Sequence, residues 1–481
     1  MSFSEVFKIV SSQKETENGG IAYSSTDSDV LNLFSMVGAL RSRDNAEIIK
    51  MYDAARHEDK ELADSIVLYS RNIRENGCGE RRVGRILLKR LAELDPQKVI
   101  RNFDIIVKNG RWDDLFCLFD TPIEDKMILF LLKNLEQDIH DFSERKPISL
   151  LAKWMPSVKT SSKETVRQAK KICRFAGIQE KDYRKTLSGL RSYLRVTERL
   201  MSQKQWNEID FETVPSVAMN RYMTAFHRNC GERFQEYINE VKEGKKKINA
   251  SVLFPYNIIE SMYDDDEDKE LLEEQWKALP NYLNKPYNVI CMCDISGSMY
   301  WADNGRPLST SIGLGIYFAQ HNTGDYHGLY MTFSEMPSLI KIDENAPLYE
   351  IVQDVKRKGG YNTNLDAAFQ EIFALATVAN DAPAALIVIS DMEIDNYKES
   401  SFGIVDKWER EFADAGLKMP KLILWNVEAR HDTFLSTKFN KNVAFISGSS
   451  ASTFSHLADL IENDSYTAMK KILSLPQFQW N

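Results

Sequence analysis

Short apolar runs alternate with amphipathic helical patterns from residue 285 to the end of the chain. The runs have the length and the Val, Ile and aromatic content of buried strands, and they occupy residues 287–294, 326–333, 384–391, 421–427 and 442–448. Helical patterns lie between them, at residues 308–320, 363–379 and 402–416, and again after Ser452. This alternation predicts a doubly wound α/β domain, with a parallel sheet covered by helices on both faces.

Polar residues follow the strand-like runs at the edge where ligands bind in such sheets. Asp294, Ser296 and Ser298 alternate at the end of the first run, Thr363 lies in a polar loop before a helix, and Asp391 follows residues 384–390. Taken alone, the first three residues fit a turn, a nucleophile with helpers, or oxygen ligands. The whole set contains only oxygen donors, which suit a divalent cation, with Mg²⁺ preferred and Mn²⁺ or Ca²⁺ as alternatives. An outside carboxylate or phosphate oxygen would complete the coordination.

Catalytic motifs are missing from the sequence around these residues. Ser296 and Ser298 do not lie in a G-x-S-x-G elbow, and no histidine lies in the three loops that could activate them. The chain also contains no H-E-x-x-H pair, no G-x-x-x-x-G-K-[ST] loop and no G-x-G-x-x-G after a strand. We therefore expect a protein that is not an enzyme.

The chain before residue 264 has a different pattern, in which one amphipathic helix follows another. Residues 95–110 show it clearly, with Asp95 as N-cap, Pro96 in the first turn and Gly110 as the stop. Residues 161–177 repeat it, with a capping box from Ser161 to Glu164 and Gly177 at the end. Successive helices joined by short polar turns predict an irregular, HEAT-like array of α-helical repeats.

These patterns divide the chain into four parts. We expect an N-terminal segment at residues 1–30, a helical repeat domain at 31–263, an acidic linker and helix at 264–284, and the α/β domain at 285–481. The acidic cluster at 264–268 lacks the glycine and ligand spacing of an EF-hand loop, so we interpret it as an exposed domain border.

Positive charge is concentrated in one stretch of a chain whose net charge is −9. Residues 151–250 contain 21 Lys and Arg against 11 Asp and Glu, a segregation that suits a polyanion. The alternative is that these cations are only the solvated faces of helices. The candidate nucleic-acid contacts are Arg184, Lys185, Arg191, Arg195, Arg199, Lys245, Lys246 and Lys247.

The cellular compartment is suggested by cysteines and hydropathy. The six cysteines are scattered, and Cys291 and Cys293 would point to opposite faces of a strand, so we expect reduced thiols in a cytoplasmic protein. No apolar run approaches the length of a membrane span, and the first residues lack the layout of a secretory signal.

The sequence "DISGSM" at 294–299, with Thr363 and Asp391 downstream, resembles the metal-ion-dependent adhesion site of von Willebrand factor A domains. The resemblance spans residues 285–481. It implies that Ser296, Ser298 and Thr363 coordinate the ion directly, whereas Asp294 and Asp391 act partly through water. The extra acids Glu393 and Asp395 depart from that family's pattern.

The helical half is similar to an uncharacterised family found in phages, giant viruses, bacteria and plants. The segments that carry the similarity include "NGRWDDLFCLFD", "LAKWMPS" and "KINASVLFPYNII". That family resembles in layout the TROVE proteins of Ro ribonucleoprotein particles, in which helical repeats and a von Willebrand factor A domain form a ring. The resemblance implies a non-catalytic scaffold that binds single-stranded or misfolded RNA. The alternative is a metal-dependent protein-interaction scaffold, in which a partner carboxylate completes the ion.

Overall fold

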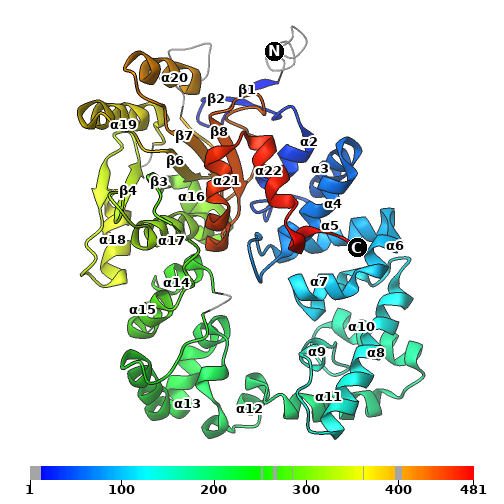
Figure 1. Ribbon diagram of the computed structural model, residues 1–481. Coiled ribbons are helices and arrows are strands. Elements are labelled where there is room, and N and C mark those ends of the chain that lie inside the picture. Colours follow the sequence, from blue (N-terminus) through cyan, green and yellow to red (C-terminus); the bar gives the residue numbers. More distant parts are fainter. Residues whose placement is uncertain (1–11, 251–252, 264–267, 284, 361, 396–403) are drawn as a thin grey trace. The chain divides into compact units, whose positions relative to one another are not determined.

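The computed structural model describes residues 12–250, 253–263, 268–283, 285–360, 362–395 and 404–481 (Figure 1). The chain forms two compact units. The first combines residues 1–83 with 248–479, and the second contains residues 84–247 and 480–481. We call them the sheet unit and the helical unit.

A six-stranded sheet forms the centre of the sheet unit, in the order β5-β4-β3-β6-β7-β8. The strands are β3 (Val289–Asp294), β4 (Leu329–Phe333), β5 (Leu339–Lys341), β6 (Ala385–Ser390), β7 (Lys421–Asn426) and β8 (Val443–Ser447). Every neighbouring pair is parallel except β4 and β5, which are antiparallel. The expected α/β sheet is confirmed, but the prediction of a purely parallel sheet missed the edge strand β5, whose three residues are too few to give a periodic signal.

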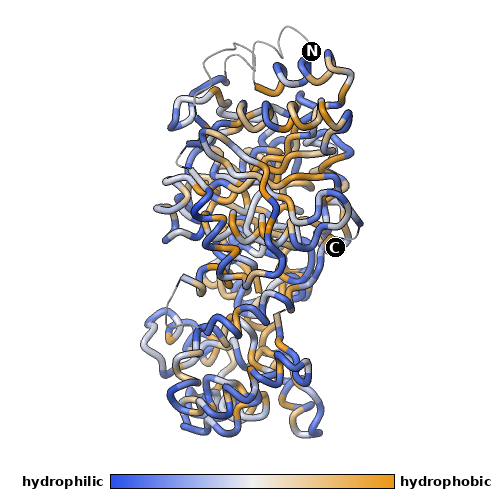
Figure 2. Tube along the Cα trace, turned by 90° about the vertical axis from the view of Figure 1, so that its left-hand side faces the viewer, coloured by the Kyte–Doolittle hydropathy of each residue, from blue (hydrophilic) through white to orange (hydrophobic). Residues whose placement is uncertain are grey.

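The central strands are apolar because both faces of the sheet are covered. All residues of β3, β6, β7 and β8 are buried. Figure 2 shows hydrophobic segments gathered in the interior of this unit. Two buried faces remove the need for alternating polarity, which explains the continuous apolar runs in the sequence.

Helices from both ends of the chain pack against this sheet. Helix α17 contacts β3, β4 and β6, and α21 and α22 contact β8. The helices and 3-10 turns that follow residue 248 in this unit are α14 (Pro255–Ser261), α15 (Lys269–Lys277), α16 (Gly297–Trp301), η4 (Ala302–Gly305), α17 (Arg306–His321), α18 (Leu348–Lys358), α19 (Leu365–Ala379), α20 (Ile404–Asp414), η5 (Ala451–His456), α21 (Leu457–Glu462), α22 (Ser465–Leu473) and η6 (Pro476–Phe478).

The N-terminal segment is part of the sheet unit, although it is far away in sequence. It contains the hairpin β1 (Gln13–Glu15) and β2 (Ile21–Tyr23), followed by α2 (Asp29–Met36), α3 (Asn45–Glu58) and α4 (Lys60–Arg71). Helix α2 packs against β8, and Gly38 donates its backbone N–H to Ser447 Oγ at 2.9 Å. A Cβ atom at Gly38 would lie 2.6 Å from the backbone of Ser447, so this close approach requires glycine.

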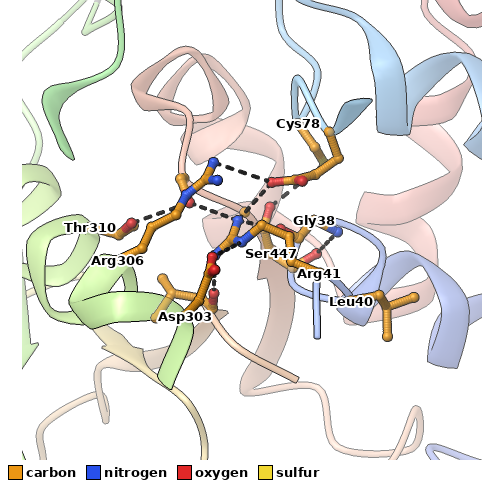
Figure 3. A network of polar contacts seen from close by, with 12 residues as sticks. Gly38, Leu40, Arg41, Cys78, Asp303, Arg306, Thr310 and Ser447 are labelled. Carbon is orange, nitrogen blue, oxygen red and sulfur yellow. Dashed lines mark hydrogen bonds and ion pairs between the residues drawn. The ribbon is translucent and has the colours of Figure 1, made fainter. Parts of the chain in front are cut away.

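A buried ion-pair network fixes the N-terminal segment to the loops around the sheet (Figure 3). The Arg41 guanidinium lies 2.7 Å from Glu80, 3.3 Å from Asp303 and 3.8 Å from Glu428. It also donates to the carbonyl oxygen of Val427 at 2.8 Å. Because Arg41, Glu80 and Glu428 are nearly inaccessible to solvent, removing one charge would leave the others without compensation.

The helical unit confirms the helical prediction for its part of the chain. Its elements are α5 (Arg81–Leu94, which begins in the sheet unit), α6 (Pro96–Arg101), α7 (Phe103–Asn109), η1 (Trp112–Leu118), α8 (Glu124–Ser143), α9 (Leu151–Trp154), α10 (Lys163–Ala176), α11 (Glu180–Tyr193), α12 (Thr197–Ser202), η2 (Trp206–Glu208), η3 (Phe211–Thr213) and α13 (Ser216–Lys242).

Most of the helix caps predicted for this unit were correct. Asp95 caps α6 by accepting from Lys98 N, and Gly177 ends α10 with φ of 65°. The pattern from 95 to 110 is two helices, because the backbone leaves helical geometry at Asn102. The N-cap of α10 is Ser162, one residue after the expected capping box at Ser161.

The division of the sequence by composition differs from the division into compact units. Residues 31–83 belong to the sheet unit, whereas composition alone grouped them with the helical repeats. Of the expected acidic linker at 264–284, residues 264–267 and 284 lie outside the described residues, and α15 occupies most of the rest.

Candidate metal centre

The order of the strands places two carboxylates at one point of the sheet. From β3 the chain proceeds to β4 on one side, and it later returns to β6 on the other side. Asp294 is the last residue of β3, and Asp391 directly follows β6. Because β3 and β6 are parallel, with Cys293 beside Ile389, their carboxyl ends meet at this switch point.

The three residues of the D-x-S-x-S motif form a compact cluster of oxygens. Asp294 is fully buried, and its Oδ1 accepts from the Ser296 backbone N–H at 2.9 Å. The other oxygen, Oδ2, accepts from the Ser390 hydroxyl at 2.5 Å. Ser296 Oγ and Ser298 Oγ lie 3.1 Å apart. The turn after β3 therefore brings the Ser296 backbone N–H to the Asp294 carboxylate and the two serine hydroxyls next to each other.

Asp391 supplies a second buried negative charge beside Asp294. Burial raises the pKa of the Asp294 carboxyl to about 7, and repulsion from the Asp391 carboxylate adds to the shift. Two carboxylates that share a desolvated site repel one another, and a bound cation removes this repulsion. The donor set of two carboxylates and two hydroxyls fits a hard divalent ion such as Mg²⁺.

Thr363, the fifth predicted ligand, is buried and bound to the loop that follows Asp391. Its hydroxyl donates to the Glu393 carbonyl oxygen at 3.4 Å and accepts from Asp395 N at 3.1 Å. Its backbone N–H donates to the Asp395 carboxylate at 2.6 Å. The structure thus joins Thr363 to the third loop of the site through Glu393 and Asp395.

A basic residue that the sequence reasoning missed lies against the site. Arg430 Nη2 lies 3.0 Å from Asp391 Oδ2, and Arg430 Nη1 lies 3.0 Å from Glu17 Oε2. Arg430 follows β7, so the rule that sites lie at carboxyl ends of strands pointed to its loop. Nothing in the sequence pointed to Glu17, which comes from the hairpin more than 400 residues earlier.

The β1–β2 hairpin covers the third loop through several hydrogen bonds. Thr16 Oγ1 donates to the Ile394 carbonyl oxygen at 2.6 Å, and Glu17 N donates to Glu393 Oε2 at 2.7 Å. Asn18 Nδ2 donates to the Glu393 carbonyl oxygen, also at 2.7 Å. The acids that depart from the adhesion-site pattern therefore hold the hairpin, and Glu393 also accepts from Thr433 at 3.0 Å.

The predicted RNA-contacting cations fall into two groups in the structure. Arg191 donates to the carbonyl oxygens of Ala152 and Met155, and Arg199 donates to that of Ser188. Lys245 and Lys246 form ion pairs with Glu243 and Glu240. The cations of the second group are exposed, and they are Arg184, Lys185, Arg195 and Lys247.

Comparison with known proteins gives two family matches and no activity. Residues 129–286 match a domain of unknown function (DUF2828), and residues 288–469 match another domain of unknown function (DUF7788). The chain is 28% identical over 483 residues to an uncharacterized protein of Acanthamoeba polyphaga mimivirus, covering 91% of this chain and 83% of that protein. These matches confirm the similarity to an uncharacterised family with a giant-virus member.

A solved structure with a similar arrangement is the crystal structure of the Deinococcus radiodurans RO (RSR) protein. It matches with a TM-score of 0.40 and 14% sequence identity, covering 89% of this chain and 99% of that chain. Within the described residues, no helix is both long enough and apolar enough to cross a membrane.

Proposed function

We propose that this protein is a non-catalytic RNA-binding scaffold whose sheet unit, similar to a von Willebrand factor A domain, holds a divalent cation. The observation that carries the RNA proposal is a set of exposed cations in the helical unit that no described carboxylate neutralises. Arg184, Lys185 and Arg195 belong to this set. Phosphates are natural partners for such cations, and binding to them would weaken as salt increases.

Exposed aromatic rings lie close to these cations in the sequence. Phe175, the last but one residue of α10, follows the exposed Arg174, and Tyr193 is the last residue of α11, two residues before Arg195. Exposed rings next to cations are the usual surface for single-stranded nucleic acid, because bases stack on the rings while phosphates contact the cations. This combination favours a single strand over a duplex.

The RNA proposal is tested with a triple substitution, Arg184→Gln, Lys185→Gln and Arg195→Gln, in the full chain. A single-stranded RNA of mixed sequence should bind the unchanged protein with an affinity that falls steeply between low and moderate salt. The triple variant should bind about tenfold or more weakly and show a shallower salt dependence, measured by fluorescence anisotropy.

The matched control removes the same charge from exposed positions of the sheet unit, Arg410→Gln, Lys418→Gln and Lys441→Gln. It should retain the affinity of the unchanged protein. Equal loss in both triple variants would mean that only net charge matters. Binding that is absent, or insensitive to salt, would contradict the proposal.

The metal proposal rests on the buried Asp294 and Asp391 carboxylates and is tested separately, by calorimetric titration with Mg²⁺ and Mn²⁺. Asp294→Asn should weaken binding about ten- to 100-fold, because the residue orients the motif's hydroxyls and compensates the ion's charge. Asp381→Asn serves as the control and should leave the titration unchanged. Asp381 is an exposed carboxylate shortly before the first residue of β6, at the end of the strand away from Asp391. Equal affinity in all three proteins would rule out this metal centre.

A metal-dependent protein-interaction scaffold is the second candidate function. Ser298, which is only half-buried, favours it, because an ion held there has a side open to a partner's carboxylate. In that case Asp294→Asn and chelator would both abolish capture of the partner. Chelator should leave RNA affinity unchanged, whereas it should abolish capture of a partner through the ion, so measuring both separates the two functions.

A further inference from the structure

A large cavity of the sheet unit lies next to the D-x-S-x-S turn but contains none of its predicted ligands. Its volume is about 1390 Å³, and α14, α16, η4, α17 and α18 supply its walls. Residues that matter for its chemistry are Tyr263, Tyr300, Trp301, Arg306, Tyr349 and Lys356. Pockets for a single small molecule are commonly about 300–1,000 Å³, so this cavity has room for several linked units.

Two aromatic side chains of α16 are exposed on the cavity wall. Trp301 is 83% exposed and Tyr300 is 55% exposed, and their ring centroids lie 5.7 Å apart in an edge-to-face arrangement. An exposed tryptophan of this degree is unusual, because burying its ring is strongly favourable. The pair therefore offers a free aromatic surface to a planar ligand.

A cation without a partner carboxylate lies in the same cavity. Lys356 is half-buried, and its ammonium lies over the ring of Tyr263 at 4.1 Å. No described carboxylate pairs with it, and burial lowers its pKa. A second cation, Arg306, lies over the ring of Tyr256 at 4.2 Å. An anionic group in the cavity would supply the missing counter-charge to Lys356.

Neither described carboxylate of the cavity lining, Asp303 or Glu260, forms an ion pair with Lys356. Asp303 pairs with Arg41 at 3.3 Å, the network shown in Figure 3. Glu260 is half-buried, and burial raises its pKa while the charge of Arg306 opposes the rise. Lys356 is therefore a positive charge that no described carboxylate of the cavity wall neutralises.

The loop between α16 and α17 has a backbone that most side chains avoid. Asp303 and Asn304 have φ of 40° and 57°, and Gly305 follows with φ of 82°. A run of left-handed residues is unfavourable for non-glycine residues, and surrounding contacts must hold it in place. The Arg41 ion pair with Asp303 is such a contact, and it holds this wall of the cavity in position.

We propose that this cavity binds nucleotide units, with a base stacked on Trp301 and Tyr300 and a phosphate beside Lys356. An aromatic surface next to an uncompensated cation matches the two parts of a nucleotide, whereas an acidic peptide would use only the cation. The source is a free nucleotide or a single strand. The strand form rests on the RNA binding proposed above, and the free-nucleotide form does not.

The experiment uses the full chain and two probes, a labelled ten-nucleotide oligouridylate in anisotropy and AMP in saturation-transfer NMR. Trp301→Ala and Lys356→Gln should each weaken, by about ten- to 100-fold, the binding of whichever probe binds the unchanged protein. The conservative variants Trp301→Phe and Lys356→Arg should stay within about threefold of the unchanged protein. Binding of AMP would identify a free nucleotide as a ligand, and binding of the oligomer alone would identify the strand.

Matched controls use exposed residues outside the cavity lining. Val378→Ala removes an 89% exposed apolar side chain of α19, and Arg357→Gln removes the cation next to Lys356. Both should bind like the unchanged protein. Equal binding by Trp301→Ala, Lys356→Gln and these controls would overturn the inference, and so would competition by an oligoglutamate peptide but not by nucleotides.

Failure of the two proposals can be told apart. If Trp301→Ala weakens binding and the helical triple variant does not, the cavity proposal stands and the role of the helical cations fails. If only the triple variant weakens binding, the role of the helical cations stands and the cavity proposal fails. If neither probe binds the unchanged protein, the cavity proposal is wrong whatever the triple variant does.

Discussion

Arg41 in the sheet unit is enclosed by Glu80 and Glu428, whereas Arg184 and Lys185 in the helical unit are exposed and have no described carboxylate partner. The sheet unit encloses Arg41 where strand ends and loops converge, and carboxylates surround it. In the helical unit, Arg184 and Lys185 lie on the exposed side of α11, where water solvates them. The charge of Arg41 is part of the fold, and the charges of Arg184 and Lys185 are available to a ligand.

The strongest test of this comparison removes Arg41. Arg41→Met should destabilise the protein by about 3–5 kcal/mol, because Glu80 and Glu428 would remain buried without a counter-charge. Urea denaturation measures the loss. Arg43→Met is the control, since its partners Glu47 and Asp432 are half exposed, and it should lose less than about 1 kcal/mol. Similar losses of stability in both variants would contradict the distinction between enclosed and exposed charges.

Arg191 is an exception within the helical unit, since its guanidinium binds the Ala152 and Met155 carbonyls and the Ser157 hydroxyl. Arg191→Met should destabilise the protein by about 2–3 kcal/mol, because buried carbonyls lose charged donors. Arg184→Met should change stability by less than about 0.5 kcal/mol. Under conditions where both variants are folded, only Arg184→Met should weaken RNA binding. The opposite ranking would show that burial does not separate structural from binding cations here.

Lys421 is the corresponding exception in the sheet unit, a buried cation at the start of β7 that donates to the Asn463 carbonyl. Burial lowers its pKa from 10.5 to about 8. The folded state therefore disfavours the charged form, and stability should increase as pH rises from about 8 to 10.5.

The expected gain over that pH range is about 1–2 kcal/mol after allowance for partial solvation. Lys421→Met should lack this dependence and should be more stable than the unchanged protein at pH 7. Denaturation curves at several pH values give the difference between the two proteins. A difference that stays constant from pH 7 to 10.5 would contradict the shifted pKa.

Sequence reasoning worked for the sheet because parallel strands constrain where their ends lie. Once residues 289–294 and 385–390 were recognised as strands, Asp294 and Asp391 had to approach the same edge. It failed for Arg430 and Glu17, since their contacts depend on loops and on a hairpin distant in sequence. It also could not separate Arg191 from Arg184, because both occupy one helix and only the packing around α9 distinguishes them.

The sheet unit is discontinuous, because residues 248–479 complete what residues 1–83 begin. During synthesis α2 emerges first, yet its partner β8 (Val443–Ser447) emerges roughly 400 residues later. Contacts of such sequence separation form slowly. The part of α2 that packs on β8 therefore has no strand to pack against while the helical unit is synthesised. The hairpin likewise cannot complete its contacts until Glu393, Ile394 and Phe434 have been synthesised, so the cover of the site is made first and placed late.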